Sequence, residues 1–238
     1  MKRGRLLSRA GALALALLAT GAARAQTALE EAAPPPVRPP VWELAAGVRA
    51  TFIKSPGYDP FSTDDGLAQF SLTGTRALLR DRADRLALVA GVGLDAGGSS
   101  ATARGAPSSL TLTRVSALAE GRYRPVARLY LFARLAPGLL HGTATIGDAS
   151  SPSGSGLTAG FDAFSLDASA GGALCFGELG SVRLGAWLVA DGGYGFATAQ
   201  HLLLAPSLGA DQSKSGTLDL GTLSPSGGFF RIALALSY

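Results

Sequence analysis

The chain ends with GGFFRIALALSY, residues 227–238, and this stretch determines how the rest of the sequence is interpreted. Every second position, counted back from the end, is apolar: Tyr238, Leu236, Leu234, Ile232 and Phe230. The positions between them are Ser237, Ala235, Ala233, Arg231 and Phe229. Strict alternation predicts a β-strand with one continuously apolar face and one face of mostly small or charged residues.

The N-terminus has the pattern of a secretory signal peptide. Basic residues between Lys2 and Arg9 precede the uncharged run GALALALLATGAA, which closes with Ala23-Arg24-Ala25. A basic segment, a short apolar segment and an A-x-A site predict cleavage before Gln26. The alternative is a membrane anchor, but the apolar run is short for a hydrocarbon core of about 30 Å.

Residues 26–40, QTALEEAAPPPVRPP, are expected to be a proline-rich extended lead-in, and residues 41–238 a single domain. Without the signal segment, 16 basic residues face 17 acidic ones, so the mature chain is near neutral. No basic patch or zinc-finger spacing indicates nucleic-acid binding. Cys175 is the only cysteine of the chain, so an intrachain disulfide cannot form.

The remaining sequence predicts an all-β fold. Hydrophobic residues make up 47% of the chain and the mean hydropathy is +0.26, yet the apolar residues alternate with others. Eight strands are expected, at 41–53, 67–79, 86–96, 109–123, 129–140, 163–176, 181–197 and 227–238. A ten-stranded version, with a hairpin hidden in residues 198–225, stays open.

The connections alternate between long and short. Long segments rich in Gly, Ser and Pro follow the first, third, fifth and seventh strands, whereas RDRADR, RPVA and FGELG are short. Long loops at one rim and tight turns at the other are typical of an antiparallel up-and-down transmembrane β-barrel of the bacterial outer membrane. With an even number of strands, the first strand begins and the last strand ends on the same side of the membrane, which is expected to be the periplasmic side.

Charged residues gather on one face of the predicted strands. That face holds Glu43, Arg49, Asp95, Arg114, Glu120, Arg122, Arg134, Asp167, Arg183, Asp191 and Arg231. Arg76 alone falls on the apolar face, near the periplasmic end of the second strand. A barrel of eight strands has an interior that side chains just fill. We therefore expect an ion-paired, plugged lumen; an ion pathway lined by the same charges is the alternative.

A soluble barrel would also alternate, with its apolar face inward. Strand length and aromatic placement favour the membrane instead, because the strands match the 9 to 11 residues or so that a tilted span requires. The aromatic residues collect at strand ends, as in interfacial girdles. They are Trp42, Phe52, Phe70, Tyr123, Phe164, Phe176, Tyr194, Phe196, Phe230 and Tyr238.

The C-terminal alternation that ends on Tyr238 resembles the β-signal of outer membrane proteins, although phenylalanine is commoner at that end. The region from Val41 resembles the small eight-stranded outer membrane barrels of the OmpA, OmpX and OmpW types. The resemblance implies outer membrane location, contact with its lipid and assembly by the barrel assembly machinery. It carries no ligand, cofactor or catalytic residue, and the proline-rich lead-in is a departure from it.

Residues that could carry chemistry are few. His141 and His201 lie near loops that contain Ser150, Ser151, Ser213 and Asp148, but no spacing fixes a Ser/His/Asp arrangement. The two histidines and Cys175 make no credible metal site, and no cofactor is expected. The apolar segment HLLLAPSL, residues 201–208, could contact lipid, cover the barrel mouth or dock a partner.

We expect a non-enzymatic barrel with a structural or surface-interaction role through its loops, whose ligand or partner the sequence does not name. Two alternatives are a narrow conduit for small apolar molecules, as in OmpW-like barrels, and a lipid-modifying barrel enzyme.

Overall fold

The computed structural model describes residues 40–103, 105–147, 156–179, 184–206 and 216–238. The predicted signal peptide, nearly all of the lead-in, and Arg183 lie outside these ranges. The described part is all β apart from one short 3-10 helix, η1 (Asp59–Phe61). None of its helices is long and apolar enough to cross a membrane.

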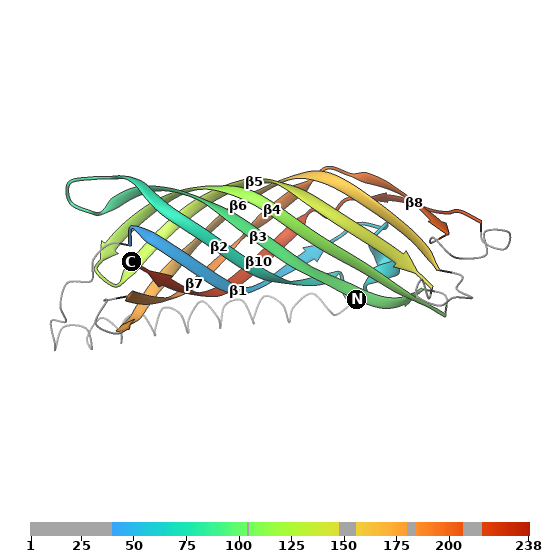
Figure 1. Cartoon of the computed structure of the whole chain (residues 1–238), viewed down its shortest axis with the longest axis horizontal. Coiled ribbons are helices and arrows are strands. Elements are labelled where there is room, and N and C mark those ends of the chain that lie inside the picture. The colour runs from blue at the N-terminus through green and yellow to red at the C-terminus, as the bar shows by residue number, and fades with distance from the viewer. Residues whose placement is uncertain (1–39, 104, 148–155, 180–183, 207–215) are drawn as a thin grey trace, which may run out of the picture. The chain divides into compact units, whose positions relative to one another are not determined.

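Eight strands form a closed antiparallel ring (Figure 1). They are β1 (Trp42–Ile53), β2 (Gly66–Arg80), β3 (Leu86–Ala103), β4 (Ala106–Val126), β5 (Leu129–Ile146), β6 (Leu157–Leu179), β7 (Leu184–Ala197) and β10 (Gly227–Ser237). Each strand pairs with the next along the ring, from β1 to β7, and β10 joins β7 to β1. The predicted all-β, eight-stranded up-and-down barrel is confirmed.

The ring closes between the first and last strands. Their register runs from Glu43↔Ser237 to Ile53↔Gly227, and Tyr238 adds backbone hydrogen bonds of 2.8–2.9 Å to Val41 and Trp42. We call this end of the barrel, which also carries the short β2–β3 and β4–β5 connections, the turn end. The opposite end, where β1 joins β2 through η1, is the loop end.

The outward face carries the apolar side of each strand. All ten aromatic residues of the predicted girdles are exposed, between 46% for Tyr123 and 71% for Tyr238. Leu234 is 60% exposed and Val48 is 65% exposed. Arg76 is also on this face, with its guanidinium 4.9 Å from the ring centre of Trp42.

Four strands are longer than the sequence predicted. The β3–β4 ladder continues to Ala103↔Ala106 and the β5–β6 ladder to Ile146↔Leu157. The outward residues there are polar: Ser100, Thr102, Ser109, Thr111, Thr143, Thr145 and Thr158. The alternation of apolar and other residues stops where these polar residues begin, although the backbone pairing of the strands continues. The strand ends predicted from hydropathy therefore come too early.

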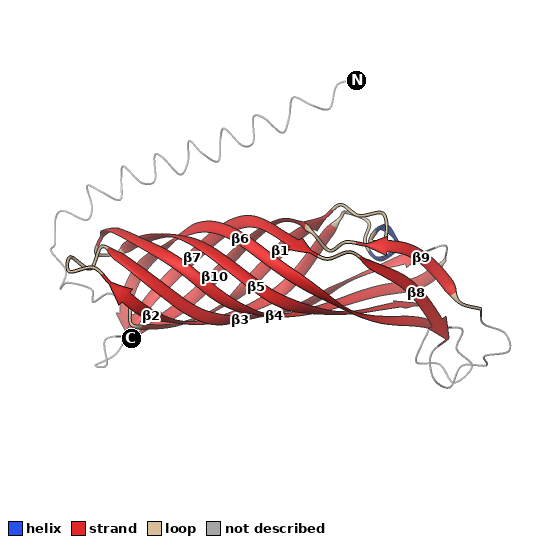
Figure 2. Ribbon diagram, turned by 90° about the horizontal axis from the view of Figure 1, so that it is seen from above, coloured by secondary structure: helices blue, strands red, loops and turns tan. Residues whose placement is uncertain are grey.

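The hairpin left open in residues 198–225 exists, but it does not enter the ring. Strands β8 (Gln200–Pro206) and β9 (Leu218–Leu223) pair with each other, and β8 meets β6 only at Leu157↔Pro206 and Thr158↔Ala205. Figure 2 shows this hairpin and η1 together at the loop end. The barrel therefore has eight strands with an accessory hairpin at one rim.

Candidate functional site

The interior of the barrel holds the charged residues of the strands. Of the eleven predicted positions, ten are described, and all are buried, with relative exposures of 1 to 7%. They are Glu43, Arg49, Asp95, Arg114, Glu120, Arg122, Arg134, Asp167, Asp191 and Arg231. These comprise five arginines and five carboxylates, so the described interior is electrically balanced.

One group of these residues lies near the turn end. Both terminal nitrogens of Arg122 donate to the carboxylate of Glu43 at 3.1 Å, and its Nε donates to Glu120. The hydroxyl of Tyr130 donates to the same Glu43 carboxylate at 2.8–2.9 Å. Arg134 Nε donates to the other oxygen of Glu120 at 2.7 Å. Glu43 thus has a charged and a neutral donor, whereas Glu120 has two charged donors.

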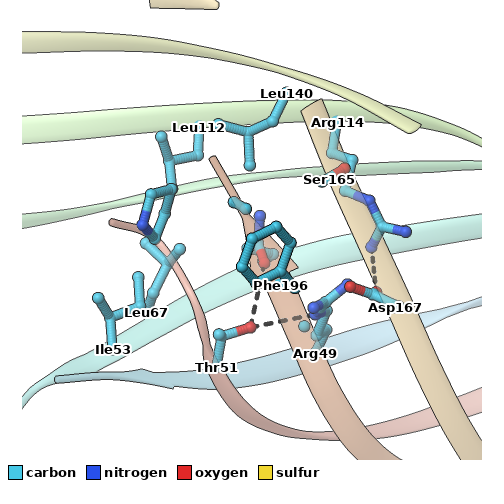
Figure 3. A pocket seen from close by; sticks show the side chains of 14 residues that line it. Arg49, Thr51, Ile53, Leu67, Leu112, Arg114, Leu140, Ser165, Asp167 and Phe196 are labelled. Atoms are coloured by element: carbon cyan, nitrogen blue, oxygen red, sulfur yellow. Dashed lines mark hydrogen bonds and ion pairs between the residues drawn. The ribbon is translucent and has the colours of Figure 1, made fainter. Parts of the chain in front are cut away.

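A second group lies in the middle of the barrel. Arg49 Nη1 donates to Asp167 at 2.6 Å and to Asp95 at 3.2 Å. Arg114 Nη1 donates to the same two carboxylates, and its Nη2 donates to the carbonyl of Ala136 at 2.9 Å. Figure 3 shows Arg49 and Arg114 pointing at Asp167 from different strands. Two arginines therefore share two aspartates across the lumen.

Asp191 joins Arg231 to the first group. It faces Arg231 across the β7–β10 ladder and accepts a forked pair of hydrogen bonds, from Nε at 2.8 Å and from Nη2 at 2.6 Å. Arg134 Nη1 lies 3.7 Å from the same carboxylate. Forked Arg–carboxylate pairs are among the strongest charge-assisted hydrogen bonds. Burial of charge is tolerated when every group is paired in this way.

Aromatic rings fill the space beside the ion pairs, and of these only Phe229 was assigned from the sequence to the face that carries the charges. Phe229 lies 4.0 Å below the Arg49 guanidinium, Tyr130 4.5 Å from that of Arg122, and Phe132 4.8 Å from that of Arg134. Cations stack favourably on such faces. Trp187 is fully buried and donates from Nε1 to Ser237 at 2.8 Å. The signal for all four is parity, because each lies an even number of residues from a charged inward residue on its strand.

The loop end of the lumen is apolar. Its inward residues include Ile53, Leu67, Leu110, Leu112, Leu140 and Phe161. Tyr58 and Phe61 from η1 and its approach pack on them, as do Leu202, Leu204 and Leu223 from the β8–β9 hairpin. We call this set the apolar cap. Of segment 201–208, residues 201–206 are described, and they direct Leu202 and Leu204 into the mouth of the barrel rather than toward lipid.

Two small cavities lie in the lumen, one between the ionic residues and the apolar cap and one among the ionic residues themselves. One of about 20 Å³ is lined by Arg49, Asp167 and Ser165 beside cap residues (Figure 3), and one of about 10 Å³ by Asp95, Arg114 and Arg231 among others. Each has the size of one or two water molecules. Ser165 Oγ and Asp95 Oδ1 are buried atoms without a protein partner, so each cavity contains a polar atom that a water could satisfy.

The two histidines lie outside the barrel. His141 Nδ1 is 2.8 Å from Asp162 Oδ1, and His201 Nε2 is 3.2 Å from Asp219 Oδ1, with side chains more than half exposed. Ser150, Ser151, Ser213 and Asp148 lie outside the described residues. In the part of the chain that the structure describes, no group of three or more His, Cys, Asp or Glu residues could hold a metal ion.

The five residues of the predicted assembly signal, Phe230, Ile232, Leu234, Leu236 and Tyr238, all face outward from β10 or its end, with exposures of 43 to 71%. Their neighbours on the inward side, such as Ala233 and Ala235, are buried. The last strand therefore presents a continuous apolar ridge at the seam of the barrel.

Comparisons with known proteins return structures and no sequence relatives. No protein-family model matches the chain, and no curated protein matches it. The fold is similar to that of Ail, the attachment invasion locus protein of Yersinia pestis, solved alone and with the heparin analogue sucrose octasulfate. Both comparisons give a TM-score of 0.46 over 83% of this chain and 97% of that one, at 12% and 14% identity respectively. It is also similar to Neisserial surface protein A, with a TM-score of 0.43, 11% identity, and coverage of 83% and 96%.

Proposed function

We propose that the chain is an integral protein of the bacterial outer membrane, with the turn end in the periplasm and the loop end outside the cell. The observation that supports this most directly is the inside-out sorting of side chains. Apolar residues cover the outer wall. The charged residues of the described strands are buried inside, except for Arg76 and for charged residues near the strand ends. In hydrocarbon every backbone polar group needs an internal partner, which a closed ring of strands supplies.

The orientation follows from the connections. Small outer membrane barrels place short turns in the periplasm and long connections outside. The described turns at the turn end are short, while the loop end carries η1, the β8–β9 hairpin and the polar extensions of β3 to β6. The exported N-terminus and the chain end would then both lie on the periplasmic side.

We further propose that the lumen is sealed and that the protein acts through its outer surface, without enzymatic activity. The balanced ion pairs, the aromatic rings beside them and the apolar cap support a sealed lumen. Both described histidines are more than half exposed and lie outside the lumen, away from its buried charges. A conduit for small apolar molecules is less well supported, because the side chains of the apolar cap fill the loop end of the lumen.

Planar-bilayer recording tests the sealed lumen. Purified barrel should give no discrete openings, and Leu204→Ala, which weakens the cap while leaving the ion pairs in place, should give none either. Stepwise conductance of the native protein would refute the proposal. Location has its own test: the protein should co-fractionate with the outer membrane and migrate differently on a gel before and after heating.

A further inference from the structure

A row of small inward-facing residues crosses five neighbouring strands of the barrel. Thr73 of β2 lies opposite Gly93 of β3, and Gly93 lies opposite Ser116 of β4. The row continues with Gly138 of β5, opposite Ser116, and with Ser165 of β6. Because these side chains are short or absent, the charged side chains beside the row leave part of the lumen unfilled.

The two lumen cavities border this row. The cavity of about 10 Å³, which we call the ionic cavity, is lined by the first three residues of the row. The cavity of about 20 Å³, which we call the cap-side cavity, is lined by Ser165 (Figure 3). Arg114 and Asp167 line both cavities, so their ion pair lies between them.

Three buried polar atoms beside these cavities have no protein partner. Asp95 Oδ1 belongs to the ionic cavity, Ser165 Oγ to the cap-side cavity, and Arg114 Nε to a residue that lines both. The three residues are only 4%, 2% and 4% exposed, respectively. A buried polar atom without a hydrogen-bond partner is destabilising, so each of them points to a partner that the protein does not supply.

The chemistry of these atoms determines what the partner can be. An ionised carboxylate oxygen only accepts hydrogen bonds, whereas the Nε–H of arginine only donates. A cation would serve Asp95 but not Arg114, and an anion would serve Arg114 but not Asp95. Water both donates and accepts, and it needs roughly 10–15 Å³ of accessible volume, which matches one molecule in each cavity.

We propose that each cavity binds one internal water molecule. In the ionic cavity, the water accepts a hydrogen bond from Arg114 Nε and donates one to Asp95 Oδ1. In the cap-side cavity, the water bonds to Ser165 Oγ. Both sites depend on interior contacts alone and not on the proposed membrane location.

The water in the ionic cavity lies where the two ionic groups of the lumen meet. This cavity is also lined by Arg134 and Arg231, which belong with the group near the turn end. Arg231 is close enough to Asp95 for their opposite charges to attract, although the ion pairs of the described residues join each of them to other partners. The water therefore adds hydrogen bonds at a place where the side chains of the two groups approach without direct contact.

The direct test is a crystal structure of the purified protein, from crystals grown in chloride and, separately, in bromide. We expect one ordered water in each cavity, within about 3.2 Å of Asp95 Oδ1 and Arg114 Nε in one and of Ser165 Oγ in the other. A cavity without density for a water overturns the assignment of that cavity. Anomalous signal from bromide in a cavity also overturns it, because the ligand would then be an anion.

The Gly93→Ala variant tests the ionic cavity in solution by adding a methyl group to it. Its Cβ would lie 2.9 Å from Ser116 Oγ and 3.6 Å from Thr73 Cγ2, with no backbone atom of another strand nearer. Gly121→Ala is the matched control, because nothing lies within 4 Å of a Cβ at that position.

Relative to this control, Gly93→Ala should raise the unfolding equilibrium constant in urea about five- to 150-fold, because the methyl group displaces the water and leaves Asp95 Oδ1 unpaired. A dry cavity gives the opposite result, since the methyl group then fills a void. Stability equal to or above that of Gly121→Ala therefore overturns the proposal.

Gly93→Ser separates loss of the water from crowding of Ser116. Its Cβ makes the same contact, but its hydroxyl can replace the water as a donor to Asp95, so most of the lost stability should return. An equal or greater loss in Gly93→Ser would mean that crowding causes the effect, which overturns the proposed water.

Discussion

Replacing Asp191 by asparagine removes the carboxylate that joins Arg231 to Arg134 in the lumen. In the native barrel its side chain is fully buried and takes both hydrogen bonds of the Arg231 fork, with Arg134 at 3.7 Å. The variant keeps one amide oxygen as a neutral acceptor for Arg231, which also donates to Ser71 at 3.4 Å, but it removes the negative charge. It also gives the described interior a net positive charge.

The expected loss follows from the cost of leaving one buried charge unmatched. Breaking a buried ion pair on one side costs about 3–5 kcal/mol, which corresponds to a factor of roughly 200 to several thousand in the unfolding equilibrium. Arg231→Met should cost less than Asp191→Asn, because Asp191 then keeps Arg134 as a partner. Replacing both, as Asp191→Leu with Arg231→Met, should return most of the stability, since apolar residues of similar volume often substitute for buried pairs without loss.

The assay is equilibrium unfolding in urea in the presence of lipid vesicles, followed by tryptophan emission. Trp187 is fully buried in the lumen, whereas Trp42 is 54% exposed on the outer wall, so loss of the interior changes the environment of Trp187 most. A loss below about 1 kcal/mol for Asp191→Asn would mean that the lumen is wet enough to screen the charge. If Asp191→Leu with Arg231→Met is as unstable as Asp191→Asn, the loss comes from altered packing at this site and not from an unmatched buried charge. Either result refutes the reasoning.

Three further predictions concern the cap, the seam and the last residue. Leu204→Ala should cost about 2–5 kcal/mol of local stability and expose the β8–β9 hairpin to protease, whereas Leu203→Ala, at a site already 52% exposed, should leave the digestion pattern unchanged. Gly47→Val should abolish the folded gel band, because a Cβ there would lie 2.1 Å from the Ile232 carbonyl oxygen across the seam. Gly121→Ala is the control, because nothing lies within 4 Å of a Cβ at that position. A folded Gly47→Val barrel would contradict the register between β1 and β10. Tyr238→Ser should reduce insertion in cells while barely changing stability after refolding in vitro. The Tyr238 side chain is 71% exposed, and the hydrogen bonds of this residue to Val41 and Trp42 are made by its backbone, which the variant keeps. Equal insertion of the native and variant proteins would refute an assembly signal at this position.

The ring of strands was predictable because period-two alternation records the environment on each side of a sheet. Arg49 and Leu44 differ in parity within one strand, and the sequence places one inside and the other outside before any contact is known. The same parity would have placed Trp187 inside, beside Asp191, had it been applied to every residue. Where both faces become polar, as beyond Gly98 in β3, the pattern loses its contrast and the predicted strand ends too early.

The sequence by itself predicted export of the chain, and it determined an alternating all-β architecture and which residues face which side. Only the tertiary structure decided the partners: that Arg49 and Arg114 share Asp167, that Asp191 joins Arg231 to Arg134, and that Leu202 and Leu204 cap the mouth. The physical reason is that facing depends on local alternation along one strand. Pairing depends on strand order, stagger and closure of the ring, which bring distant residues into contact, such as Arg49 and Asp167, 118 positions apart, and Arg231 and Ser71, 160 positions apart.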